Sequence, residues 1–132
     1  MKLITRNTDY ALRAICHLAK QKKMVKVAEL VRVLGVPRPF MRKILQRLSK
    51  ERVLESSKGQ AGGFKLRLSA EKISFIQIMR IFQGQVSLSE CFLKKDICPN
   101  KGRCILRKKI RMIESSVLGQ LRQINIASLI EK

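Results

Sequence analysis

Three cysteines lie close together near the middle of the chain, in the run ECFLKKDICPNKGRC. Cys91, Cys98 and Cys104 have six and five residues between them, a spacing at which thiolates on an irregular segment can converge on one metal centre. Zinc sites and iron–sulfur clusters usually take four ligands, so this set of three is incomplete. A metal centre here needs a fourth ligand from elsewhere, or the cysteines serve a different chemistry.

Two metal-free or structural uses of these thiols stay open. Exposed Cys91 and Cys98 can oxidise, which would make the segment a thiol sensor without metal. A zinc ion can instead hold the segment in one shape without sensing a signal. Cys16 stands apart on the apolar face of an expected helix, and we expect it to be an ordinary buried residue.

The charge balance narrows the class of partner. The 132 residues carry 29 Lys and Arg against 9 Asp and Glu, a formal net charge of +20. Such a field favours polyanions, either nucleic acid or an anionic membrane surface, and we expect nucleic acid. The helix pair and hairpin described below make double-stranded DNA the expected partner. No apolar run reaches the ~18 residues that span a bilayer, and the N-terminus lacks a signal-peptide core, so we expect a cytoplasmic protein without a membrane partner.

An enzyme is not expected. The chain has one histidine, no acid–base pair at a plausible site, and no phosphate-binding glycine motif followed by Lys and Ser or Thr. We therefore expect no small-molecule substrate.

The elements that carry these residues begin with a predicted helix-turn-helix. Apolar residues at helical spacing predict helices over residues 8–22, 27–34 and 39–50, the first capped by Thr8. Gly35 ends the second helix, and the third leaves basic and amide side chains outward, as suits phosphates and base edges. The third helix is expected to bury Phe40, Met41, Ile44, Leu45 and Leu48.

A β-hairpin over residues 53–68 follows directly, with a glycine-containing tip and alternating apolar and basic residues. A hairpin after a recognition helix is the wing of a winged helix, and glycines let its backbone approach phosphates. Lys58 at the tip can reach into a minor groove. The residues expected to contact DNA are Arg38, Pro39, Arg42, Lys43, Gln46, Arg47, Lys58, Gly59, Gln60 and Gly62.

The second half of the chain predicts how two subunits form a dimer. Residues 73–82 form a further helix, residues 105–123 form the longest one, and Asn125 caps a short last helix. The apolar stripe of the long helix is expected to pack against a second subunit. It consists of Leu106, Ile110, Ile113, Val117, Leu121 and Ile124.

The expected fold is mainly α with a small β-hairpin wing, a winged helix-turn-helix followed by a long C-terminal dimerisation helix. Residues 1–84 form the winged-helix DNA-binding domain. Residues 85–104 form a cysteine-containing sensor loop, and residues 105–132 form the dimerisation helix and the C-terminal helix.

Four segments carry a family resemblance: TDYALRAI at 8–15, FMRKILQRLSK at 40–50, SKGQAGGFKL at 57–66, and the triple cysteine before a long helix. In this order they resemble the Rrf family of bacterial winged-helix transcription regulators. The resemblance implies a homodimeric DNA-binding regulator, most often a repressor. The wing departs from the family pattern, because Lys58 stands where many members have arginine and so lacks a planar fork.

The resemblance also bears on the cysteines. Cluster-binding members carry three cysteines before the dimerisation helix, and in IscR-like members a histidine follows three residues after the third; here Arg107 stands there. In NsrR-like members the Asp of the TDYALR motif, here Asp9, reaches the cluster from the partner subunit. The resemblance thus implies a 4Fe–4S rather than a 2Fe–2S cluster, held by Cys91, Cys98, Cys104 and the partner subunit's Asp9.

The sequence leaves alternatives open for the signal that the protein senses and for the role of Asp9. Nitric oxide, redox stress and iron status all fit a cluster sensor. Asp9 can instead serve only as a favourable charge at a helix N-terminus, worth ~0.3–1 kcal/mol. The alternative function is a cluster-free regulator controlled by thiol oxidation or by a protein partner.

Overall fold

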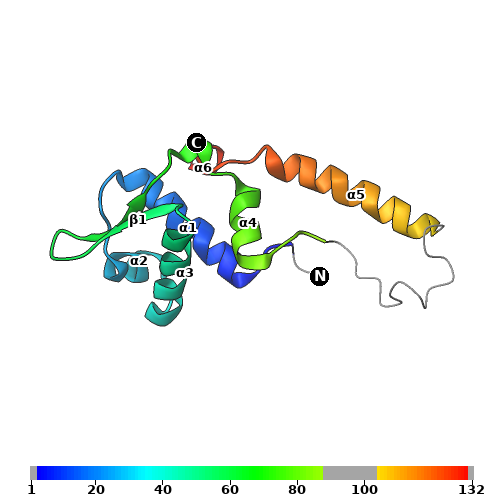
Figure 1. The fold of residues 1–132 in the computed structure, drawn as a ribbon. Coiled ribbons are helices and arrows are strands. Elements are labelled where there is room, and N and C mark those ends of the chain that lie inside the picture. The colour runs from blue at the N-terminus through cyan, green and yellow to red at the C-terminus, as the bar shows by residue number, and fades with distance from the viewer. Residues whose placement is uncertain (1–2, 88–103, 131–132) are drawn as a thin grey trace.

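The structure is a computed structural model that describes residues 3–87 and 104–130 (Figure 1). A compact group of helices bears a hairpin on one side, and one long helix extends from the other. Cys91 and Cys98 lie outside the described residues. The elements are α1 (Arg6–Gln21), α2 (Val27–Leu34), α3 (Arg38–Lys50), β1 (Leu54–Ser57), β2 (Gly63–Leu66), the 3-10 turn η1 (Ala70–Lys72), α4 (Phe75–Gln83), α5 (Ile105–Arg122) and α6 (Ile126–Ile130).

Helix α1 begins earlier than the sequence predicts. Thr5 is its N-cap, and the Thr5 Oγ1 accepts a hydrogen bond from the Thr8 backbone N–H at 3.4 Å. The prediction that Thr8 caps the helix is wrong, because Thr5 offers the same hydroxyl three residues earlier. Thr8 instead lies within the first turn and is fully buried.

The helix-turn-helix has the predicted bounds. Helix α2 ends at Leu34, and Gly35 takes a left-handed φ of 68° while its N–H donates to the Val31 carbonyl at 2.9 Å. Helix α3 then starts with Pro39 in its first turn, where proline costs no hydrogen bond. Four of its five expected core residues are buried, namely Met41, Ile44, Leu45 and Leu48.

Phe40 is the exception, because 51% of its surface is exposed. The prediction that it belongs to the core is wrong. Phe40 lies four residues before Ile44, so periodicity places it at the edge of the buried stripe, but the core does not cover the first turn of α3. The first turn of α3 also leaves Arg38 and Pro39 exposed.

The wing is an antiparallel hairpin in which Leu54 pairs with Leu66 and Ser57 with Gly63. Its attachment to the body comes from outside the hairpin: the Val25 N–H donates to the Phe64 carbonyl at 2.9 Å, and the Phe64 N–H donates to the Val25 carbonyl at 2.8 Å. These two bonds fix the hairpin to the segment between α1 and α2. The wing therefore has a set position relative to the helix-turn-helix.

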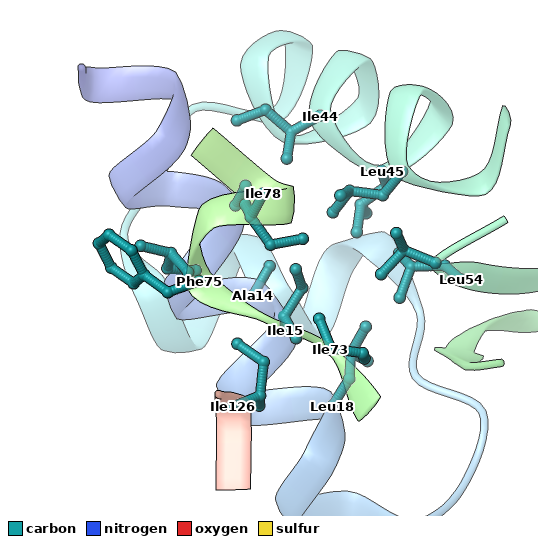
Figure 2. Packing of buried hydrophobic residues seen from close by; sticks show 14 of the residues in the cluster. Ala14, Ile15, Leu18, Ile44, Leu45, Leu54, Ile73, Phe75, Ile78 and Ile126 are labelled. Atoms are coloured by element: carbon teal, nitrogen blue, oxygen red, sulfur yellow. The ribbon is translucent and has the colours of Figure 1, made fainter. Parts of the chain in front are cut away.

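The core is mainly aliphatic and joins α1, α3, α4, β1 and α6, whose labelled side chains gather together in Figure 2. Helix α6 returns to this core: the Ile126 N–H donates to the Ile73 carbonyl and the Phe75 N–H to the Ile124 carbonyl, both at 2.9 Å. Asn125 caps α6 as predicted, since its Oδ1 accepts from the Ser128 N–H at 2.9 Å.

Helix α5 matches its predicted bounds closely, but its apolar stripe is divided. Leu121 is buried, and Val117 packs against the core of the same chain. Toward the other end, Leu106 is 68% exposed and Ile113 is 53% exposed. Figure 1 shows why: the N-terminal part of α5 projects away from the body. Within the described residues, no helix is both long and apolar enough to cross a membrane.

The close approach of Gly63 to the Val25 backbone can be tested by substitution. A Cβ there would lie 2.5 Å from the Val25 carbonyl oxygen, and its φ of +145° disfavours side chains. We expect Gly63→Ala to lower the free energy of unfolding by about 2–3 kcal/mol. Gly35→Ala is the control, because it shares a positive φ but meets no atom within 4 Å; it should cost about 1 kcal/mol. Equal losses in urea unfolding would contradict the Val25 contact.

Candidate nucleic-acid interface and metal-ligating residues

One surface of α3 collects the side chains expected to contact nucleic acid. The buried stripe of Met41, Ile44, Leu45 and Leu48 faces the core and so orients the opposite side outward. All six predicted contact residues of this helix are exposed. They are Arg38, Pro39, Arg42, Lys43, Gln46 and Arg47.

The cationic side chains on this surface make few ion pairs among the described residues. The only ion pair found for α3 among the described residues joins Arg47 to Glu51, with 3.5 Å between the Arg47 Nη2 and a carboxylate oxygen. Both side chains are exposed, and such surface pairs contribute little to stability. Arg47 can therefore exchange this carboxylate for a phosphate oxygen at small cost.

The wing tip is a tight turn built on glycines. Lys58, Gly59 and Gln60 are exposed, whereas Gly62 is buried. The Gly62 N–H donates to the Gly59 carbonyl at 3.1 Å, and a Cβ on Gly62 would lie 2.3 Å from the Ser57 carbonyl oxygen. Gly62 is thus required for closing the turn, and the turn presents Lys58 at the tip.

A contact between α1 and α2 supports the orientation of the helix-turn-helix. The His17 Nε2 lies 3.1 Å from a Glu29 carboxylate oxygen, and the His17 side chain is mostly buried. The hydrogen bond with His17 lowers the pKa of Glu29 from its ordinary value. The sequence predictions do not include this pair, although the single histidine lies on α1 and the glutamate lies in the first turn of α2.

Cys104 is the one member of the cysteine triplet within the described residues. It is a free thiol, partly exposed, at the N-cap of α5, and its Sγ accepts the Arg107 backbone N–H at 3.5 Å. Cys16 differs from it in setting. Cys16 packs against the core, and burial raises the pKa of its thiol while Lys20 opposes that rise.

Asp9 lies in the first turn of α1 and is half-exposed, with its carboxylate 3.0 Å from the Arg13 Nε. It borders an open hollow of about 420 Å³ whose other lining residues are Ile4, Thr5, Arg6 and Tyr10. An exposed i,i+4 pair of this kind is weak, so the carboxylate is available for another partner.

Gln83, the last residue of α4, holds the chain segment before α1. Its Oε1 accepts from the Thr5 N–H at 2.9 Å, and its Nε2 donates to the Leu3 carbonyl at 3.0 Å. Sequence analysis could not find this contact, because it joins residues about eighty positions apart. It connects the start of the segment that leads to the cysteines with the start of α1.

The structure does not bring Asp9 and Cys104 together within one chain. The described residues contain no group of three or more His, Cys, Asp or Glu that could hold a metal ion. In Figure 1 the N-terminal end of α5 lies far from the N-terminal end of α1. The donor chemistry still fits an iron–sulfur cluster, because Cys104 offers a free thiol that accepts one long hydrogen bond from a backbone N–H, and Asp9 offers an accessible carboxylate.

Comparisons with known proteins agree with a helix-turn-helix regulator. A family model named Rrf2 and described as an iron-dependent transcriptional regulator matches residues 4–132. A protein of Aquifex aeolicus (strain VF5) named as an HTH-type transcriptional regulator is 33% identical over 124 residues, which cover 92% of this chain and 86% of that protein.

Two solved structures share the fold. CymR of B. subtilis, described as the global cysteine regulator, has a TM-score of 0.79 at 21% identity, covering 98% of this chain and 97% of that chain. IscR of T. potens has a TM-score of 0.72 at 21% identity, covering 98% of this chain and 86% of that chain. At such identities they show the winged-helix fold alone, which confirms the predicted fold class.

Proposed function

This chain belongs to the Rrf2 family of transcriptional regulators, and from that membership we propose how it binds its operator and how its cysteine segment controls binding. Regulators of this family act by binding DNA and are not enzymes, as the sequence predicted. The finer functions proposed are repression, dimeric DNA binding and control by an iron–sulfur cluster. Access to chromosomal DNA requires the cytoplasmic location expected from the sequence.

The observation that carries the DNA-binding mode is the outward surface of α3 beside the glycine-closed wing tip. In a winged helix, α3 enters the major groove and the wing follows the backbone or minor groove. Lys43 and Gln46 lie in the middle of the outward surface and have the chemistry to meet base edges. Arg47, at the flank, and Lys58, at the tip, are suited to phosphates.

Arg47→Gln tests the phosphate role. We expect affinity to fall on all duplex sequences alike, and the slope of log affinity against log salt to become shallower by about 1. Lys72→Gln is the matched control: it removes one exposed cation from η1, which belongs to neither α3 nor the wing, and should leave the slope nearly unchanged. Fluorescence anisotropy over a salt series measures both; a flat salt dependence of the wild type would contradict DNA binding through this surface.

A homodimer formed through α5 is the second part of the proposal. Its support is the exposed apolar surface at the N-terminal part of the helix, which includes Leu106, Met112 and Ile113. Such a surface is unfavourable in water and favours burial against a complementary surface. A second copy of α5 offers the same surface, and two recognition helices suit operators with two half-sites about one helical turn apart.

Ile113→Glu tests the dimer. A carboxylate in an apolar interface loses hydration without gaining a partner, so we expect a monomer near the 15.2 kDa chain mass in sedimentation. Ser115→Glu adds the same charge at an exposed position two residues away, which lies on another side of the helix, and should sediment at twice that mass. If Ile113→Glu stayed dimeric, the pairing surface would have to be sought outside this stripe.

The third part concerns the cysteines. We propose that Cys91, Cys98, Cys104 and the partner subunit's Asp9 hold a 4Fe–4S cluster. Support comes from the free Cys104 thiol at the α5 N-cap, the accessible Asp9 carboxylate, and Arg107 in place of a histidine ligand. When bound, the cluster supplies iron that is open to nitric oxide or oxygen through its more easily displaced carboxylate ligand.

The protein's own residues provide a route from the cysteine segment to the DNA surface. Gln83 immediately precedes that segment and hydrogen-bonds Thr5 and Leu3 ahead of α1. Helix α1 in turn contacts α2 through His17 and Glu29. A change in the cysteine segment can therefore shift α1 and alter the spacing of the two recognition helices in the dimer, which both half-sites must match at once.

Anaerobic purification of wild type and Asp9→Ala tests the ligand set. We expect the wild type to contain iron and acid-labile sulfide with visible absorbance, and Asp9→Ala to lose the cluster faster under oxygen or nitric oxide. Arg13→Gln is the control, because it removes the ion-pair partner but keeps the Asp9 carboxylate. An unchanged spectrum and unchanged cluster lifetime in Asp9→Ala would exclude the ligand role.

The cluster-free alternative rests on one observation, the partly exposed free thiol of Cys104. The same anaerobic sample discriminates the alternatives. Zinc without iron would favour a structural metal, and protein without metal would favour thiol oxidation or control by a protein partner.

A further inference from the structure

We propose that Phe40 determines part of the operator sequence by contacting the C5-methyl group of a thymine in the major groove. This inference rests on the DNA-binding function proposed above and adds to it a residue that is neither basic nor amide. It concerns base recognition, not phosphate binding or folding.

Phe40 is exposed where an aromatic side chain is unexpected. Among the described residues it is the only aromatic side chain in the exposed class; Tyr10, Phe64 and Phe82 are partly buried and Phe75 is buried. The core does not need it, because α3 is already anchored by four buried aliphatic and Met side chains. The ring, 51% exposed, is therefore free to contact a partner of α3.

Its place on α3 supplies that explanation. Phe40 lies in the first turn of the helix, and the N-terminal residues of a recognition helix are those that meet base edges. Residues three and seven positions further on share a stripe of an α-helix, so Phe40 is in line with Lys43 and Arg47. Both of these are exposed cations.

The chemistry of this stripe limits what can cover the ring. Arg38, Arg42, Lys43 and Arg47 surround Phe40 in the sequence without an acidic residue between them, so the occupant must be anionic overall. It must also present an apolar group to the ring. In the major groove the apolar group of a base pair is the thymine methyl, which meets both requirements beside the phosphates.

Removal of the methyl group from DNA tests the contact directly. A preferred duplex is first selected from a random library with the wild-type dimer, and each thymine is then replaced singly by deoxyuridine, which keeps the pairing and hydrogen-bonding groups. We expect one position in each half-site at which the wild type loses about threefold to tenfold in affinity. Phe40→Ala should lose a similar factor on the unmodified duplex and show no further loss with deoxyuridine at that position.

Val33→Ala is the matched control, because Val33 is an apolar side chain of α2 with a similar exposed fraction, 47%. It should keep the full sensitivity to deoxyuridine. Phe40→Leu retains an apolar group and should keep part of it. Thermal melting and sedimentation of each variant show that the fold and the oligomeric state are preserved.

Three results would overturn the inference while leaving the proposed function intact. The first is a deoxyuridine effect that is equally large in Phe40→Ala and in the wild type, and the second is a Phe40→Ala variant with unchanged affinity. The third is a changed sedimentation mass in Phe40→Ala, which would assign the ring to a protein contact instead. A wild-type dimer that selects no duplex at all would overturn the proposed DNA binding itself.

Discussion

The packing of α3 on the core is the constraint on which the rest of the molecule depends. Met41, Ile44, Leu45 and Leu48 fill one side of the helix and are buried with residues of α1 and α4. Because a helix is rigid about its axis, burial of this stripe decides which side chains face outward. The basic surface of α3 therefore results from apolar packing on the opposite side of the helix.

The wing depends on a second, local constraint. Its strands are short, and a two-stranded hairpin is marginal in water without support. The support comes from the paired hydrogen bonds between Val25 and Phe64, which require the close backbone approach at Gly63. The same segment connects α1 to α2, so the wing, α1 and the helix-turn-helix are joined at one place. A movement of α1 therefore has a direct path to both α3 and the wing, the two elements proposed to contact DNA.

The long helix α5 carries the proposed ligand Cys104 away from the body of its own chain. One end packs on the body that carries its own winged helix, while the other bears Cys104 and exposed apolar residues away from it. A ligand set that includes both Cys104 and Asp9 therefore cannot be completed by these residues of one chain as arranged here. In the proposed dimer, cluster binding and the arrangement of the two subunits are thermodynamically linked. A cluster held by residues of both chains binds only the arrangement that brings those residues together, and so stabilises it.

The sequence by itself determined the elements whose causes are local. Hydrophobic periodicity and a glycine in left-handed conformation set the bounds of α2, alternation set the hairpin, and Asn125 marked the start of α6. Charge and motif order were sufficient for the family. The ten expected DNA contacts and the cluster ligands remain predictions, because contact with DNA or metal is a property of the complex.

Tertiary structure decided what depends on distant parts of the chain. It exposed Phe40, since the share of α3 that the core covers depends on how α1, α2 and β1 meet it. It divided the α5 stripe between the body and open surface, and it joined Gln83 to residues before α1 across nearly eighty positions. Periodicity states which residues share a face, but only the packed chain determines how far the neighbouring elements cover that face.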